Sequence, residues 1–217
     1  MPRSRFAPMT ADDMARARRV LMRRDPRLAP IIKTHGACGL KTGREHDIFC
    51  GLVEAIVSQQ LSTRAAATIY GRVRALLPDG GPPTPEALLP LSDEQLRAAG
   101  LSRQKLGYLR DLSTRMLDGS INTANLVEMT DDEIVAELTK IKGIGRWTVE
   151  MLLIFRLTRP DVFPAGDLGI VKAVQRTYNL RATPDVKRLH QIAERWRPYR
   201  SVASWYLWAS LGVKAGA

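Results

Sequence analysis

The sequence contains little cysteine and little histidine. Its 217 residues include two cysteines, Cys38 and Cys50, and three histidines, His35, His46 and His190. The cysteines do not form a CxxC pair and the histidines are widely separated along the chain. We therefore expect no disulfide framework, no zinc site and no iron–sulfur cluster, because each of these needs more ligands at closer spacing.

Long hydrophobic runs are also missing. Near the C-terminus the longest stretch without a formal charge, Ser201–Val213, is shorter than the roughly 20 apolar residues that cross a bilayer. The N-terminus carries a charge every few residues instead of an apolar signal core, and its acidic Asp12 and Asp13 argue against an organellar transit peptide. We expect no membrane segment and a cytoplasmic location.

Strand-like alternation of apolar and polar residues is absent, whereas apolar residues recur at helical spacing in almost every segment. The hydrophobic content of 45% is sufficient for a core and excludes a disordered chain. The fold class predicted is all-α. One apolar stripe is formed by Ile48, Phe49, Leu52, Val53, Ile56 and Val57, which predicts a helix buried on one side.

Capping residues predict where several helices begin. Thr10 is expected to cap a first helix that continues to about Arg24, and Asp25 with Pro26 is expected to begin a second that ends near Gly36. Further predicted elements are a helix from the cap Ser62 to about Leu77, a loop over Pro78–Glu86, and helices capped by Ser92, Ser102 and Thr130, with capping boxes completed by Gln95 and Glu133.

The charge is strongly positive, with 33 lysines and arginines against 22 aspartates and glutamates and a net charge of +11. Such a surplus favours a polyanionic partner, although an arginine-rich composition without such a partner gives the same total. Residues 1–27 hold eight arginines against three aspartates. This basic arm fits a nonspecific phosphate contact or a solvated helix face.

The segment from Leu138 to Gln175 contains two expected helices around the turn Lys142, Gly143, Ile144 and Gly145. Glycines on either side of an apolar residue allow a tight hairpin, and the free N–H groups of the next helix can bind a phosphate. Arg146 can add a direct phosphate contact. Glycine-bounded turns also occur for purely structural reasons. The helix after the turn is expected to continue to about Leu157.

Four segments in order along about three quarters of the chain resemble the helix-hairpin-helix (HhH-GPD) DNA glycosylases, specifically the AlkA type of 3-methyladenine DNA glycosylase II. These segments are IVSQQLSTRAA at 56–66, KGIGRWT at 142–148, DVFPAGDLG at 161–169 and WRPYRSVASWYLW at 196–208.

The resemblance implies an all-α fold in which two helical subdomains flank a DNA-binding cleft and the two chain ends share one subdomain. It divides the chain into a basic N-terminal helical segment at 1–42, packed with the C-terminal helices, and a glycosylase core at 43–217, with the helix-hairpin-helix at about 131–157. Because only about 45 residues precede the first matching helix, no N-terminal β-containing domain is expected.

The activity implied is that of a monofunctional glycosylase in base excision repair. It would flip alkylated bases such as 3-methyladenine and 7-methylguanine out of double-stranded DNA and hydrolyse the N-glycosidic bond, leaving an abasic site. Asp167 matches the catalytic aspartate. A fixed carboxylate can stabilise the cationic character that develops on the sugar and can orient the attacking water, and a helix N-terminus favours its ionised form. An aspartate there can also serve only as a helix cap.

Trp147 stands where bifunctional relatives carry the lysine that forms a Schiff base, so no strand cleavage is expected. Trp147 and Trp208 match aromatic positions that line the base pocket, where a cationic alkylated base gains about 0.5 to 2 kcal/mol from cation–π attraction. Core packing is the alternative role for such tryptophans. Met151 replaces a tyrosine of the best-known members, so the substrate range stays open: other members accept 7-methylguanine, 1-methyladenine, 3-methylcytosine or ethenoadenine, and the sequence does not choose among them.

Gln59, Gln60 and Leu61 lie at the joint between two helices, where family members insert a side chain into the gap that the flipped base leaves. Gln60 matches this wedge position, where many members have leucine, and Leu61 adjoins it; an ordinary polar helix terminus would have the same composition. The resemblance also implies a sodium or potassium ion on the backbone carbonyls of Thr139, Ile141 and Gly143. No other cofactor is expected.

Three other functions remain open from the sequence. The chain could be a non-catalytic helix-hairpin-helix module that holds DNA phosphates, a mismatch or oxidised-base glycosylase, or a basic helical protein-interaction module. Missing cluster cysteines and the tryptophan in place of the lysine weigh against the second. A monomer is expected, since a scanning glycosylase needs no partner subunit.

Overall fold

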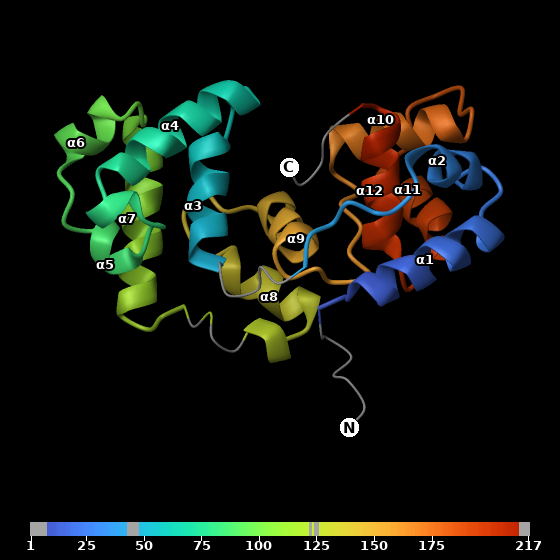
Figure 1. Cartoon of the computed structure of the whole chain (residues 1–217), viewed down its shortest axis with the longest axis horizontal. Coiled ribbons are helices and arrows are strands. Elements are labelled where there is room, and N and C mark those ends of the chain that lie inside the picture. Colours follow the sequence, from blue (N-terminus) through green and yellow to red (C-terminus); the bar gives the residue numbers. More distant parts are fainter. Residues whose placement is uncertain (1–7, 43–47, 122, 124–125, 213–217) are drawn as a thin grey trace. The chain divides into compact units, whose positions relative to one another are not determined.

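The computed structural model describes residues 8–42, 48–121, 123 and 126–212. All regular secondary structure in these residues is helical (Figure 1), which confirms the predicted all-α class. The chain divides into two compact units, one from the described residues of Met1–Glu45 and Leu153–Ala217, the other from those of His46–Leu152. No helix in the described ranges has the length and apolar character needed to cross a membrane.

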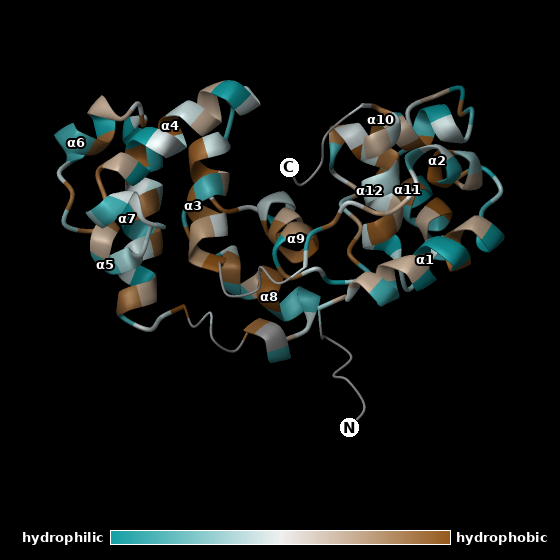
Figure 2. Cartoon of the chain, in the orientation of Figure 1, coloured by the Kyte–Doolittle hydropathy of each residue, from teal (hydrophilic) through white to brown (hydrophobic). Residues whose placement is uncertain are grey.

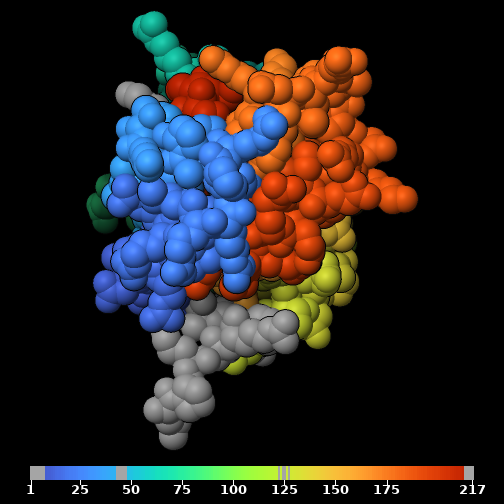
Figure 3. Space-filling view, turned by 90° about the vertical axis from the view of Figure 1, so that its right-hand side faces the viewer, coloured from blue at the N-terminus to red at the C-terminus, as the bar shows by residue number. Residues whose placement is uncertain are grey.

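The first unit combines helices from both ends of the chain. Its helices are α1 (Ala11–Arg24), α2 (Ala29–His35), α10 (Leu168–Thr177), α11 (Val186–Ala193), the 3-10 helix η3 (Glu194–Trp196) and α12 (Arg200–Ser210). The N-terminal helices α1 and α2 both pack against α12. Figure 3 shows the same arrangement, with the blue N-terminal helices directly beside the orange and red C-terminal ones.

The first predicted helix is confirmed, because Thr10 caps α1 and forms a reciprocal capping box with Asp13. Its buried side chains, Met14, Ala17 and Leu21, follow the spacing of one helical face. Arg16, Arg19, Arg23 and Arg24 are exposed, and Arg18 is half-buried. The sequence therefore encodes an amphipathic helix with an arginine-rich outer surface.

The predicted start of the second helix is wrong. Asp25 is the C-cap of α1, and α2 begins only at Ala29, after a turn. The Asp25 carboxylate is fully buried and accepts hydrogen bonds from the main-chain N–H groups of Arg27 and Leu28, from the Trp196 indole at 2.7 Å and from the Tyr178 hydroxyl. Burial and this carboxylate raise the pKa of Tyr178.

The buried carboxylate thus joins the corner after α1 to η3 and to the end of α10. A buried charge is tolerated only when donors surround it. Here the donors come from the turn after α1, from Tyr178 at the end of α10 and from Trp196 in η3. α10 is fixed at its C-terminal end by this network. Its N-terminal end carries Asp167.

The second unit is built around a long helix. Its elements are α3 (Ile48–Ser58), α4 (Thr63–Ala75), η1 (Pro78–Gly80), α5 (Pro85–Leu88), α6 (Asp93–Ala98), α7 (Arg103–Leu117), η2 (Leu126–Glu128) and α8 (Asp131–Leu138). α7 packs against α3, α5 and α6. The apolar stripe predicted for α3 is buried as expected, and the helix is largely brown in the hydropathy colouring of Figure 2.

The predicted caps Ser62, Ser92, Ser102 and Thr130 each accept a hydrogen bond from the backbone of the helix that follows. The predicted loop over Pro78–Glu86 is wrong in two places. Its beginning forms the 3-10 helix η1, and its end already belongs to α5, because Thr84 supplies a cap and Pro85 suits a first helical turn.

Helix α9 (Arg146–Phe155) begins in the second unit and ends in the first, since the boundary lies between Leu152 and Leu153. It stops two residues before the predicted end at Leu157. Thr158, just beyond, adopts the left-handed region with φ +46° and is fully buried. The chain reverses there and leads towards Asp167.

Candidate functional site

The hairpin lies between α8 and α9, and one of its glycines is structurally required. Gly143 has φ +80°, and a Cβ added to it would lie 2.2 Å from the Tyr108 ring. No such contact limits Gly145. The intervening Ile144 is buried and anchors the turn. Of the two glycines, only Gly143 therefore brings the backbone close to another group, the face of the Tyr108 ring on α7.

Lys142 and Arg146 stand on either side of the hairpin with mostly exposed side chains. Lys142 Nζ lies 4.0 Å from Asp111 Oδ1, and Arg146 lies 3.9 Å from both Asp132 and Glu150. Ion pairs this long and this exposed hold a side chain only weakly. Both cations can therefore turn towards a phosphate beside the N–H groups at the start of α9.

The carbonyl oxygens named for a cation have suitable chemistry, since hard oxygen donors suit sodium and potassium. Two of the oxygens already accept one hydrogen bond each: Ile141 O from the Ile144 N–H at 3.1 Å, and Gly143 O from the Gln59 side chain at 2.8 Å. A carbonyl oxygen has two lone pairs. Each of these two oxygens therefore keeps a lone pair that a cation could use.

The expected wedge residues lie in the turn between α3 and α4, and the structure ties this turn to the hairpin. Gln60 is exposed and has φ +58°, an uncommon conformation for a residue with a side chain. Leu61 is 39% exposed. Gln59 donates from Nε2 to Gly143 O. The turn and the hairpin are thus direct neighbours within the second unit.

Asp167 caps α10 in the first unit. Its Oδ1 accepts hydrogen bonds from the main-chain N–H of Ile170 at 2.8 Å and from the indole N–H of Trp208 at 2.9 Å. The backbone of Gly169 passes so close that an added Cβ would lie 2.9 Å from this oxygen. The two hydrogen-bond donors and the close backbone of Gly169 fix the orientation of the carboxylate.

Trp208 is buried, and its ring packs on Phe155 with centroids 5.5 Å apart. The resemblance assigned Trp208 only to a base pocket, and its hydrogen bond to Asp167 was not foreseen. Nothing in the local sequence marks this contact, because the partners are 41 positions apart. The one signal in the sequence was Gly169, because a glycine two residues after Asp167 indicates that little space is left beside the carboxylate.

Trp147 and Met151 lie one turn apart on α9, in the same unit as the hairpin. Trp147 is 49% exposed and Met151 is half-buried. A tryptophan this exposed is uncommon for a purely structural side chain. Together the two residues offer an aromatic face and a soft thioether on the surface of α9.

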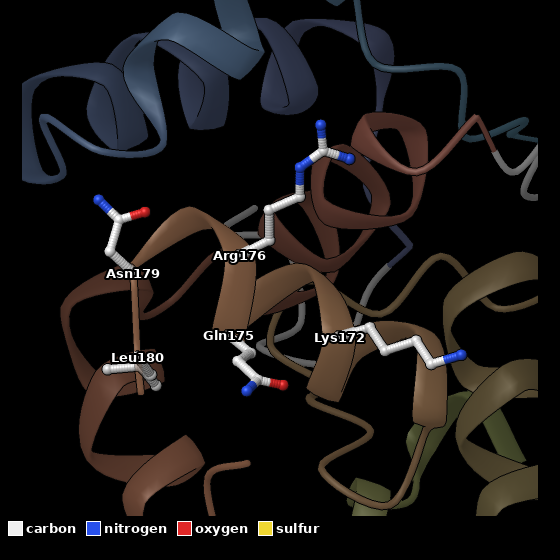
Figure 4. A pocket seen from close by; sticks show the side chains of 5 residues that line it. All are labelled: Lys172, Gln175, Arg176, Asn179 and Leu180. Atoms are coloured by element: carbon white, nitrogen blue, oxygen red, sulfur yellow. The ribbon is translucent and has the colours of Figure 1, made fainter. Parts of the chain in front are cut away.

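An open depression of about 360 Å³ lies along α10 and the turn after it. Figure 4 shows its lining, which comprises Lys172, Gln175, Arg176, Asn179 and Leu180. The lining contains no carboxylate, and Asp167 at the beginning of α10 is not among the lining residues.

The family model of the HhH-GPD superfamily of base excision DNA repair proteins matches residues 53–198. The chain belongs to this superfamily. The match spans the α3–α4 turn, the hairpin and Asp167, whereas Trp208 lies beyond its end.

Several proteins that are similar to this HhH-GPD chain are named 3-methyladenine DNA glycosylases or glycosidases. DNA-3-methyladenine glycosylase 1 of Schizosaccharomyces pombe is 40% identical over 158 residues, 72% of this chain and 69% of the relative. The structure of the 3-methyladenine DNA glycosylase Mag1 from the same yeast, in complex with abasic DNA, matches with TM-score 0.82 and 34% identity, covering 92% of this chain and 98% of that one. A DNA-3-methyladenine glycosidase structure from Bacillus halodurans matches with TM-score 0.79 and 37% identity, covering 91% and 89%.

Proposed function

We propose that this chain is a monofunctional DNA glycosylase that releases alkylated bases, 3-methyladenine and 7-methylguanine among them, from double-stranded DNA by hydrolysis. The observation that carries the proposal is the carboxylate of Asp167, held at the start of α10 by Ile170 and Trp208. The names of the relatives support the substrate class.

Asp167 acts electrostatically in this mechanism. As the N-glycosidic bond lengthens, the electron pair leaves with the base and positive charge develops on the sugar. A carboxylate already oriented towards that charge stabilises the transition state without reorganising. Water then adds to the sugar carbon and loses a proton, leaving an abasic site. Asp167 can orient this water or accept its proton.

Hydrolysis without strand cleavage follows from the residue at the start of α9. Trp147, in the position of the lysine of bifunctional relatives, has no amine with which to form a Schiff base. Its exposed ring, with Met151 beside it, is instead suited to stack on a flipped base. An alkylated base carrying a positive charge is favoured there by cation–π attraction.

The hairpin supplies the phosphate contact in this proposal, through the N–H groups around Gly145 and the side chains of Lys142 and Arg146. A monovalent cation on the carbonyls of Thr139, Ile141 and Gly143 would add a positive charge for the same phosphate. We expect the chain to act as a monomer.

The direct test is to incubate the protein with duplex DNA treated with a methylating agent and to identify the released bases by chromatography. We expect free 3-methyladenine and 7-methylguanine above the spontaneous rate. Salt-sensitive DNA binding with no released base would instead support a non-catalytic DNA-binding module. Release of oxidised bases alone would support the alternative of an oxidised-base glycosylase of the same superfamily.

Trp208→Phe tests the partner of Asp167. The substitution keeps an aromatic ring against Phe155 but removes the indole N–H that donates to Oδ1. A hydrogen bond to a charged group contributes about 1.5 to 3 kcal/mol, so we expect base release under single-turnover conditions to fall about tenfold or more. Trp205→Phe, the same change on the same helix at a residue whose ring packs on Tyr206 and Gly39, is the control and should leave the rate unchanged. Equal rates for the two variants would contradict this role of Trp208.

A further inference from the structure

Helix α7 presents three side chains, each three residues from the next, to two other segments of the second unit. Lys105 Nζ donates to the main-chain oxygens of Val57 at 2.6 Å and Gln59 at 2.8 Å. One turn along, the Tyr108 ring packs on Gly143. One turn further, Asp111 Oδ2 accepts the N–H of Lys142 at 2.9 Å. Residues at this spacing are neighbours on a helix surface.

The two segments held in this way are the wedge turn, residues 58–62, and the hairpin, residues 139–145. They are also joined to each other, because Gln59 Nε2 donates to Gly143 O at 2.8 Å. Gln59 therefore takes part twice, with its main-chain oxygen on Lys105 and its side-chain amide on the hairpin. The contacts form a closed triangle of α7, wedge turn and hairpin.

The lysine is placed where the turn most needs support. Gln60 has φ +58°, and such a conformation persists only when its surroundings enforce it. The carbonyls held by Lys105 belong to the residue directly before Gln60 and to Val57 at the end of α3. A positive charge at a helix C-terminus is also favoured by the helix dipole.

We infer that Lys105 is a positioning residue which, with Tyr108 and Asp111, holds the wedge turn and the phosphate-binding hairpin in fixed relation. The insertion of a side chain into DNA rests on the proposed function. The contacts of Lys105, Tyr108 and Asp111 with the two segments, which we call the brace, do not. Flipping a base costs a few kcal/mol. If the wedge turn is displaced when its side chain enters the DNA, the inserted side chain stabilises the flipped state less. Loss of the brace should thus lower base release more than it lowers binding to undamaged DNA.

The test compares Lys105→Met with the wild type in the whole protein. Methionine keeps an apolar side chain but has no ammonium group. In the free protein we expect amide hydrogen exchange to accelerate at least about tenfold at 58–62 and at 139–145, because both charge-assisted hydrogen bonds of Lys105 are lost. Single-turnover base release from methylated duplex should fall about tenfold, while the Kd for undamaged duplex changes less than about threefold.

Three further variants make the test specific. Lys105→Arg, which keeps the charge and the donors, should restore most of the rate. Lys33→Met, a change of an exposed lysine on α2, should alter neither readout. Gln59→Ala removes the bridge to Gly143 from a half-buried surface position, so it should fold normally and should accelerate exchange at the hairpin.

The outcomes separate this inference from the proposed function. Unchanged exchange at both segments in Lys105→Met and Gln59→Ala would overturn the brace, whatever the activity. Accelerated exchange in a protein whose wild type releases no base would support the brace and refute the glycosylase. Base release and affinity for undamaged DNA that fall by the same factor would overturn the role in insertion.

Discussion

Asp167→Asn should abolish most base release while the protein stays folded. Asparagine has nearly the same shape and keeps a carbonyl oxygen for the N–H groups of Ile170 and Trp208, so the start of α10 should survive. What disappears is the negative charge beside the developing cation. By comparison with the loss of other preorganised electrostatic groups, we expect a fall of about 10²- to 10³-fold in the single-turnover rate.

Asp185→Asn is the matched control for this substitution. Asp185 caps α11 in the same unit and accepts a hydrogen bond from the main-chain N–H of Arg188 at 2.7 Å, as Asp167 does from Ile170. If Asp167 were only a cap, both variants would lose the same small amount of stability and neither would lose activity. Asp167→Asn with a wild-type rate would remove the basis of the proposed mechanism.

Gly143→Ala should deform the hairpin and sharply weaken DNA binding. The residue has φ +80°, which a side chain disfavours, and its new Cβ would lie 2.2 Å and 2.4 Å from two atoms of the Tyr108 ring. Left-handed backbone alone costs about 1 to 3 kcal/mol, and displacement of Tyr108 adds to this. We expect a lower free energy of unfolding in denaturant titration and at least a tenfold weaker Kd for duplex DNA.

Gly145→Ala serves as the stability control, because an added Cβ there meets no atom within 4 Å. Its free energy of unfolding should stay within about 1 kcal/mol of the wild type, the usual cost of alanine at a helix cap. Equal destabilisation by the two alanines would mean that the hairpin has no special need of glycine at 143.

Local signals in the sequence were enough for most of the fold. Thr10, Ser62, Ser92, Ser102 and Thr130 cap helices as predicted, because a cap depends on residues three positions apart. At Asp25 the local signal predicted the cap-type bonds from the N–H groups of Arg27 and Leu28, but not that regular helix begins only at Ala29 or that the Asp25 carboxylate is buried. Its partners Tyr178 and Trp196 are more than 150 positions away, and these distant donors hold the carboxylate inside the unit.

The candidate site divides in the same way. Asp167 and the hairpin were found from motifs, whereas the hydrogen bond from Trp208 to Asp167 and the support that α7 gives the wedge turn were not. Lys105, Tyr108 and Asp111 form no motif and resemble any polar helix surface in sequence. Their role depends on which segments the folded unit places beside them.

Hydrolytic release of an alkylated base leaves one abasic site for each free base, and both products can be counted. A duplex with a single 3-methyladenine would be treated with excess protein, and free base, abasic sites and strand breaks would be counted in the same sample. We predict one abasic site for each released base and no strand break above that of untreated DNA. No released base, or a borohydride-trapped adduct between protein and DNA, would contradict the account.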